Sequence, residues 1–323
     1  MNKYSIFPIS LMANILSGHD KLNILIFHRV HPEIDPLFPG EITREEFDRK
    51  IEVISRAYNV LPLDYAVKKL QSGELPRKAV SITFDDGYAD NHDIALPILE
   101  KWNVSATFFI ATGFIDGGIM WNDRIIESIR LSNRQELDLS LLGLGRINIC
   151  NNENKRHSIK NIIEKIKYLE PDEREKHIIY IENESGASLP DNIMMTSDMI
   201  KNLHKAGMKI GAHTVTHPIL ANIDIKQAKN EIEQSKNALN DLLGEDIDIF
   251  AYPNGKPGTD YNKQHPALLR ETGFNLAVST CSSCATRQDD VFQLPRQTPW
   301  DKNPYYFGAR MALGYRKRCN SLL

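Results

Sequence analysis

The chain has 323 residues, of which 41% are hydrophobic and 25% are charged, and its formal net charge is −3. This length allows one large domain or a domain with an insertion. The small net charge gives no reason to expect a nucleic-acid partner, and no stretch approaches the roughly 20 apolar residues of a transmembrane segment.

The N-terminal segment does not resemble a secretory signal. Pro8, Asn14 and Gly18 interrupt its apolar residues, and no clear cleavage site follows them. We therefore expect a cytoplasmic protein and leave open a loose, peripheral association with a membrane.

The first 110 residues alternate between strand and helix patterns. Thr43 and Glu46 form a capping-box pattern, and Phe47, Ile51 and Ile54 share one face of the helix that follows. Strands are predicted at 23–27, 58–61, 79–84 and 107–110, and helices from Thr43 onward, at 63–71 and at 91–102, the last bent at Pro97.

The stretch from about Phe114 to Met195 breaks this rhythm. It is rich in charge and in helical pattern, with helices predicted at 122–131, 158–169 and 172–184. The alternation then resumes, with helices at 197–206, 224–243 and 266–272 and strands at 209–212, 247–252 and 276–279. Such alternation predicts a parallel sheet that is closed or nearly closed by helices.

Two adjacent carboxylates, Asp85 and Asp86, follow the apolar run at 79–84. That run is typical of a buried strand, so the pair lies at the strand's C-terminal mouth, where α/β proteins usually place their chemistry. Two neighbouring carboxylates are costly unless a cation or a proton separates their roles. One could bind a metal while the other transfers protons; a simple Asp-Gly turn is the alternative.

Further metal ligands are available at His213 and His217. Their spacing of four would place both on one face of a helix, but β-branched residues between them and Pro218 after them favour a strand end that runs into a turn. Either geometry lets two imidazoles meet one ion. Two histidines and one carboxylate are a common hydrolytic zinc set with a position open for water, whereas the histidines alone could be ordinary strand-end residues.

Together these elements resemble the polysaccharide deacetylase family, which is also called carbohydrate esterase family 4 or the NodB-homology family. The first motif is similar to 83–87 (TFDDG), the second to 213–217 (HTVTH), and the third, Arg-x-Pro-x-Gly, appears at 251–255 as AYPNG. The resemblance covers roughly residues 20–110 and 205–300. Any one of these motifs alone would be a weak signal.

The resemblance implies a fold of α/β class, a distorted (β/α) barrel with about seven parallel strands. The family's usual link between the first two motifs is shorter than it is here, which implies an inserted helical subdomain. The expected organisation is therefore a first barrel part at 20–113, an insertion at 114–195 and a second barrel part at 196–310. The insertion is either a wall of the substrate site or a stabilising addition.

The resemblance also implies a metal-dependent hydrolase that removes N-acetyl groups from an amino sugar of a polysaccharide, an oligosaccharide or a lipid-linked glycan. Asp86, His213 and His217 would hold a divalent metal, with zinc favoured and cobalt, nickel or manganese as alternatives. Asp85 would act as the general base. A backbone N–H near Asn254 would stabilise the oxyanion.

Two departures from the family pattern require substitute residues. The family's C-terminal Leu-x-His motif, which supplies the general acid, is missing, and His28 at the end of the first strand resembles the N-terminal acid of permuted members. Ala251 stands where the family often has the arginine that orients the base, and Arg296 could replace it; a structural role for His28 or Arg296 is the alternative. Tyr252 and Trp300 could stack on sugar rings or could simply pack in the fold.

Three other functions remain open. The same chemistry could serve a deformylase or amidase that acts on a lipid-linked sugar or a small amide. A catalytically silent carbohydrate-binding protein is a second possibility, although pure binding does not need the base Asp85. A metal-stabilised structural domain is a third, which three ligands with an open position do not favour.

Overall fold

A sheet of eight strands organises the structure, which is a computed structural model and describes residues 3–298 and 300–317. Its order is β10-β1-β3-β4-β7-β8-β9, and β2 pairs with β3. The bounds are β1 Lys21–Phe27, β2 Asn59–Val60, β3 Ala79–Phe84, β4 Thr107–Ile110, β7 Lys209–Ala212, β8 Ile249–Ala251, β9 Leu276–Val278 and β10 Ala285–Thr286. Within the described residues seven of these strands run parallel, and β10 runs antiparallel to β1.

The segment 294–297 joins the two ends of the parallel sheet. Leu294 bridges Val278 of β9, and Gln297 bridges Leu25 of β1. The Gln297 N–H donates to the Ile24 carbonyl, and the Ser279 N–H donates to the Leu294 carbonyl. The strands therefore form a ring that is closed by the irregular segment 294–297. The predicted distorted (β/α) barrel is confirmed.

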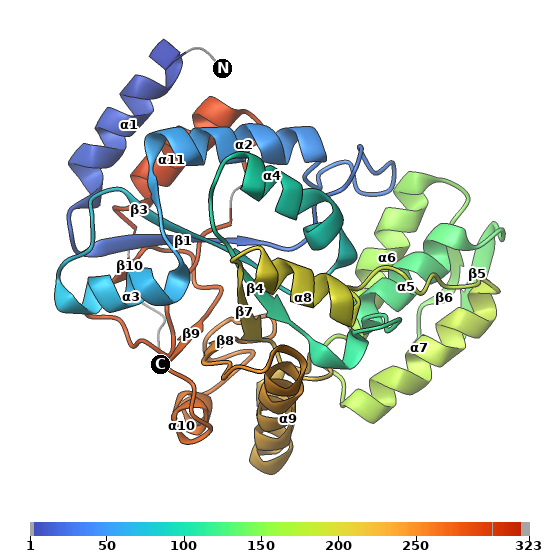
Figure 1. Cartoon of the computed structure of the whole chain (residues 1–323). Helices are drawn as coiled ribbons and strands as arrows, with labels where there is room; N and C mark the ends of the chain where they lie inside the picture. Colours follow the sequence, from blue (N-terminus) through green and yellow to red (C-terminus); the bar gives the residue numbers. More distant parts are fainter. Residues whose placement is uncertain (1–2, 299, 318–323) are drawn as a thin grey trace.

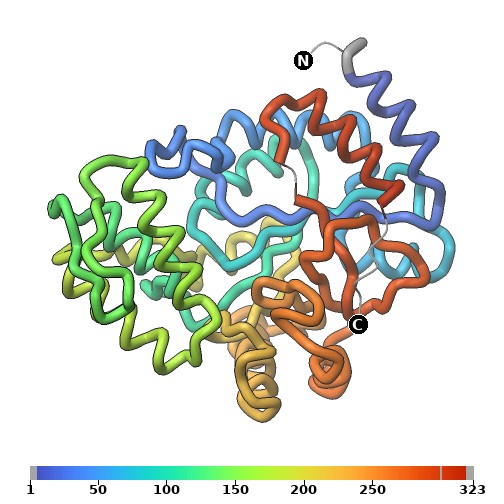
Figure 2. Tube along the Cα trace, turned by 180° about the vertical axis from the view of Figure 1, so that it is seen from behind, coloured from blue at the N-terminus to red at the C-terminus, as the bar shows by residue number. Residues whose placement is uncertain are grey.

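Helices cover the outside of the sheet (Figures 1 and 2). Helix α2 begins with the capping box that was predicted at Thr43 and Glu46, and α9 begins with a second capping box at Asp224. The bounds are α1 Lys3–Ser17, α2 Arg44–Ala57, α3 Leu63–Ser72, η1 Asn91–Ala95, α4 Leu96–Lys101, η2 Thr112–Phe114, α8 Ser197–Lys205, η4 Leu220–Asn222, α9 Ile225–Leu243, α10 Gln264–Glu271 and α11 Pro304–Gly314.

The barrel core begins directly beneath the carboxylate pair. Every residue of β3 is buried. The Phe84 ring stacks on Phe27 of β1 and on Phe108 of β4, with ring centroids 5.4 and 4.8 Å apart. This apolar packing makes the end of β3 a rigid support for the residues that follow it.

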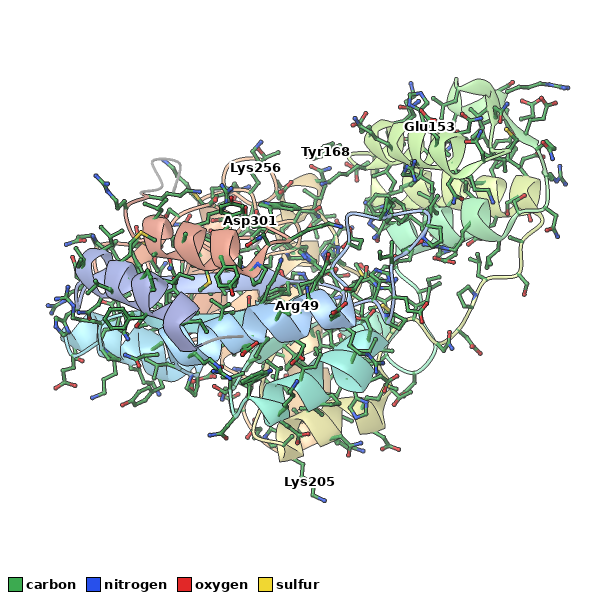
Figure 3. The ribbon with its side chains drawn as sticks, turned by 90° about the horizontal axis from the view of Figure 1, so that it is seen from above. Arg49, Glu153, Tyr168, Lys205, Lys256 and Asp301 are labelled. Atoms are coloured by element: carbon green, nitrogen blue, oxygen red, sulfur yellow. The ribbon has the colours of Figure 1, made fainter. Side chains whose placement is uncertain are left out.

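Residues 121–185 form a group of elements beside the barrel, drawn in green in Figure 1 and at the upper right of Figure 3. They are α5 Trp121–Leu131, β5 Glu136–Leu139, η3 Ser140–Leu142, β6 Gly145–Asn148, α6 Asn152–Ile166 and α7 Pro171–Ser185. These elements share a hydrophobic cluster that is separate from the barrel core. The division of the chain at 113/114 and 195/196 agrees with this picture and stays a prediction.

Several elements differ from the sequence-based expectations. The helix at 91–102 begins as a π-helical turn, η1, and Pro97 lies in the first turn of α4 instead of bending one long helix. Helices α1 and α11 and the β5–β6 hairpin were not predicted, and α1 contains Pro8 and has no acidic residue in its first turn. Among the described residues, no helix combines the length and the apolar character that crossing a membrane requires.

Candidate active site

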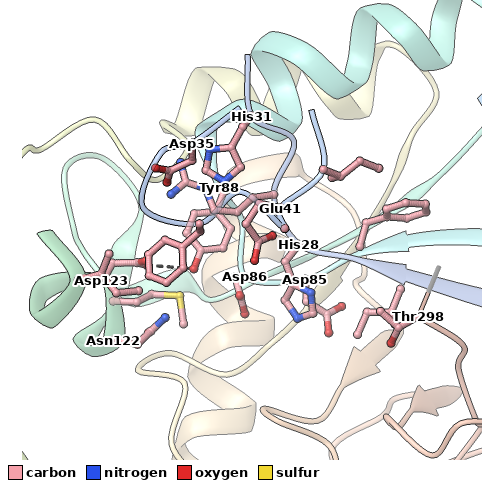
Figure 4. A pocket seen from close by; sticks show the side chains of 18 of the residues that line it. His28, His31, Asp35, Glu41, Asp85, Asp86, Tyr88, Asn122, Asp123 and Thr298 are labelled. Carbon is pink, nitrogen blue, oxygen red and sulfur yellow. Dashed lines mark hydrogen bonds between the residues drawn. The ribbon is translucent and has the colours of Figure 1, made fainter. Parts of the chain in front are cut away.

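The C-terminal ends of four parallel strands meet at one pocket of 640 Å³. His28 follows β1, Asp85 and Asp86 follow β3, His213 follows β7, and the loop after β8 contains Asn254. Figure 4 shows His28 and Asp85 together at one side of the pocket and Asp86 near its centre. The parallel register places these side chains at one edge of the sheet, as the sequence analysis expected.

Asp86, His213 and His217 converge on one point. The Nε2 atoms of His213 and His217 lie 3.3 and 3.4 Å from Asp86 Oδ1, and one ligand atom from each residue lies within 4.8 Å of the others. His213 Nδ1–H donates to the Ala251 carbonyl at 2.7 Å, so its Nε2 keeps a lone pair for a cation. This donor set suits a divalent metal.

The electrostatics of Asp86 and His217 suit the same purpose. Burial alone would raise the pKa of Asp86, but the neighbouring His213 and His217 side chains hold that pKa below its ordinary value. Burial lowers the pKa of His217 to about 3, so its imidazole is neutral at physiological pH. A charged carboxylate beside a neutral imidazole is the state that a metal requires of its ligands.

Contacts with Glu231 and Gly113 hold the loop that carries the two histidines. Glu231 of α9 accepts hydrogen bonds from the Val215 and Thr216 N–H groups, both at 2.8 Å, and from the Thr216 hydroxyl. Gly113 donates its N–H to the Val215 carbonyl, and a Cβ at Gly113 would lie only 2.8 Å from that oxygen. The predicted strand end and tight turn are therefore present, and no feature of the sequence pointed to Glu231.

Backbone strain gathers at the same site. Seven non-glycine residues of the described chain have positive φ, and four of them are Asp86, Thr214, His217 and Asn254, with φ between 54 and 77°. Such conformations cost about 1–3 kcal/mol each and persist where the surrounding structure enforces them, often at functional sites. This strain is independent support for a functional site at the ends of β3, β7 and β8.

Asp85 is paired with Arg296, as the sequence analysis suggested. Nη1 and Nη2 of Arg296 donate to the two carboxylate oxygens of Asp85, both at 2.6 Å, and the side chains are only 0% and 3% exposed. Nε of Arg296 donates to the Ser279 carbonyl, and Nη1 also donates to Thr83. Burial alone would raise the pKa of Asp85, but the charge of Arg296 holds it below its ordinary value.

His28 lines the pocket on an exposed bend after β1. Two residues that sequence analysis missed hold this bend. Asp90 accepts from the Val30 N–H and the Arg29 Nε, and the Asn91 side-chain amide donates to the His28 carbonyl at 2.7 Å. Sixty residues separate the two segments, so no local pattern could have revealed the contact.

The three predicted substrate contacts have different positions. Asn254 lines the pocket, and its N–H has no hydrogen-bond partner among the described residues. Trp300 lies at the rim with 80% of its surface exposed. Tyr252 requires a correction, because it is fully buried, stacks on the Tyr261 ring with centroids 3.9 Å apart and does not line the pocket. Its ring packs in the core and cannot stack on a sugar.

Comparisons with known proteins agree with this geometry. Residues 72–138 and 176–277 match the model of the polysaccharide deacetylase family, and the matched segments skip 139–175. The chain is 21% identical over 278 residues to YxkH of Bacillus subtilis, whose name describes it provisionally as a polysaccharide deacetylase; the match covers 85% of this chain and 70% of YxkH.

A second relative is poly-beta-1,6-N-acetyl-D-glucosamine N-deacetylase of Staphylococcus epidermidis, 25% identical over 182 residues. The match covers 53% of this chain, and the chain spans 60% of that relative's length. Among solved structures, the Streptococcus pyogenes deacetylase PplD in complex with acetate is similar, with a TM-score of 0.57 and 21% identity over 86% of this chain and 92% of that one. This likeness shows a shared fold.

Proposed function

Because the chain belongs to the polysaccharide deacetylase family, we propose that it is a metal-dependent hydrolase that removes N-acetyl groups from the amino sugars of a glycan. The observation that carries the proposal is that the two adjacent carboxylates have different partners. Asp86 faces His213 and His217, whereas Asp85 is turned to Arg296. The first arrangement suits a cation and the second suits a proton acceptor of fixed orientation.

Asp86, His213 and His217 would hold the metal, with zinc favoured by the ligand set. When bound, the cation would supply Lewis-acid chemistry to the acyl carbonyl and lower the pKa of a water molecule. Asp85 takes a proton from the attacking water, and the Arg296 guanidinium keeps the Asp85 carboxylate ionised and oriented. The Asn254 N–H donates to the oxygen on which negative charge develops.

Cleavage of the carbon–nitrogen bond needs a proton on the departing amine. His28 is the candidate donor because it lines the same pocket beside Asp85 (Figure 4). Water, the base and the acid together convert the acetamide into acetate and a free amine. The name of the Staphylococcus epidermidis relative supports an N-acetylglucosamine polymer as substrate, and a lipid-linked amino sugar is a second substrate to test.

The test measures free amine and released acid from three probes: a β-1,6-linked N-acetylglucosamine pentamer, chitopentaose and an undecaprenyl-linked amino sugar in N-acetyl and N-formyl forms. Amine release should stop with a chelator and return when zinc, cobalt, nickel or manganese is added back. Acetate released from the N-acetyl probes supports a deacetylase, and formate released only from the N-formyl form of the lipid-linked probe would indicate a deformylase. No amine from any probe, with metal bound, would refute hydrolysis and favour a carbohydrate-binding protein.

The Asp85→Asn variant tests the division of labour. Its turnover should fall about 100-fold or more because the base is lost, while the bound metal, measured by elemental analysis, stays at the wild-type level. Asp86→Asn should instead lose metal. If Asp85→Asn lost the metal as well, the two carboxylates would not have separate roles.

A further inference from the structure

The pocket extends beyond the metal site towards the inserted elements, where α5 contributes several of its first residues. Asp123 lies in the first turn of α5, lines the pocket and is only 4% exposed. Figure 4 shows Asp123 and Asn122 on one side of Asp86 and shows Asp85 and His28 on the other. A carboxyl group is therefore buried in the pocket wall on the side away from the base.

The position of Asp123 is set by the motif that carries the carboxylate pair. The hydroxyl of Tyr88, two residues after Asp86, donates to Asp123 Oδ2 at 3.0 Å. The Arg29 guanidinium lies 4.8 Å from the centre of the Tyr88 ring, and Asp90 holds Arg29 from its other side. Tyr88 is thus held between two segments of the barrel, and its hydrogen bond fixes the position of the Asp123 carboxyl group.

The second carboxyl oxygen of Asp123 is unused. Among the residues that the structure describes, none forms a hydrogen bond with Oδ1. Because Asp123 lines the pocket and only its Oδ2 is held by Tyr88, Oδ1 is available to a group that arrives with the ligand. The described mechanism does not need Asp123, because proton transfer is assigned to Asp85 and His28.

We propose that Asp123 is a specificity residue of this site: Tyr88 holds one of its oxygens, and the other accepts a hydrogen bond from a hydroxyl group of the glycan. This proposal rests on the proposed function, since it takes the glycan to be the substrate. Sugar rings present hydroxyl groups in every direction, and a fixed acceptor selects the ring orientation that can reach it. The first turn of α5 would then be part of the substrate site and not only a stabilising addition.

The experiment compares two substrates that use the same metal site. One is the β-1,6-linked N-acetylglucosamine pentamer, and the other is 4-nitrophenyl acetate, which has no hydroxyl groups. Asp123→Ala should lower kcat/KM for the pentamer about 10- to 100-fold, mainly through KM, with a much smaller change for the ester. The ratio of the two kcat/KM values should therefore fall at least about tenfold.

Two further variants protect the test against misfolding. Asp123→Asn keeps the side-chain size but has one acceptor oxygen in place of two, so the ratio should fall in the same direction. Glu153→Gln, at the outer surface of the insertion (Figure 3), is a matched control that should leave both substrates unaffected. An unchanged ratio in both Asp123 variants overturns the proposal, and so does an equal loss on both substrates, which would indicate a structural role.

Binding keeps this test separate from the proposed function. If the wild-type protein released no amine from the pentamer, deacetylation would be refuted, and calorimetric titration with the pentamer would still address Asp123. Weaker binding by Asp123→Ala than by the wild type, by about tenfold or more, would support the contact. Equal binding would overturn it.

Discussion

The pairing of Asp85 with Arg296 makes the sharpest quantitative prediction. Replacing Arg296 by methionine keeps an apolar stem of similar length and removes the guanidinium. The Asp85 carboxylate, which is only 3% exposed in the wild type, would then lack its two charge-assisted hydrogen bonds. Loss of one partner from a buried ion pair costs about 3–5 kcal/mol of the free energy of unfolding, and the Ser279 carbonyl and Thr83 hydroxyl also lose a donor.

The loss also changes proton affinity. Arg296 holds the pKa of Asp85 below its ordinary value, so Arg296→Met should raise that pKa, by one unit for each 1.36 kcal/mol of lost interaction. The base would be protonated over more of the acidic range. The acidic limb of kcat/KM against pH should therefore move to higher pH, while the content of bound metal stays unchanged.

Urea unfolding of the wild type, Arg296→Met, Asp85→Asn and the double variant provides the test. The double variant removes both charges, so its loss should be smaller than the sum of the single losses by at least about 2 kcal/mol. Additive losses within about 0.5 kcal/mol, or an acidic limb that does not move, would refute the conclusion that Arg296 controls the charge and orientation of Asp85. Arg296→Lys should lose less stability and raise the pKa of Asp85 less than Arg296→Met does, because lysine keeps the charge without the bidentate geometry.

Three further predictions follow from other contacts. Glu231→Gln should weaken metal binding about 10- to 100-fold in a competition titration, because a neutral amide with one acceptor oxygen cannot hold the histidine loop. The control Glu233→Gln, on the same helix, should leave metal binding unchanged. His28→Ala should slow amide hydrolysis about 100-fold or more with metal retained, and should slow an aryl ester less because its leaving group needs no proton; the same loss in His92→Ala would contradict a specific acid. Burial raises the pKa of Asp123 to about 7, so protonation stabilises the fold below pH 4 and this contribution disappears as the pH rises to about 7. Asp123→Asn, which is neutral throughout, should therefore gain stability relative to the wild type as the pH rises from about 4 to about 7 in urea unfolding, and a constant difference over this range would show that the carboxyl does not titrate there.

The amino-acid sequence by itself predicted the repeated strand–helix pattern and the three residues that come together as a candidate metal site. Apolar runs such as β3 are local signals, and a carboxylate pair directly after one must lie at a strand mouth. Capping residues such as Thr43 likewise mark where helices begin. Helix α11 also begins with a capping residue, Asn303, followed by Pro304, a local signal that was overlooked. Helix α1 and the β5–β6 hairpin contribute side chains to the hydrophobic clusters of other elements and depend on that packing.

Only the tertiary structure decided which residues complete the site. Arg296 reaches Asp85 because the irregular segment 294–297 lies between β9 and β1 and closes the barrel. This closure depends on pairing between residues more than 270 positions apart in the sequence. Glu231, Asp90 and Asn91 act through contacts with loops distant in sequence, and Tyr252 was misjudged because an aromatic side chain does not reveal which face it will bury. The chemistry of the carboxylate pair can be predicted from the local sequence, whereas the orientation of the pair depends on how the barrel closes.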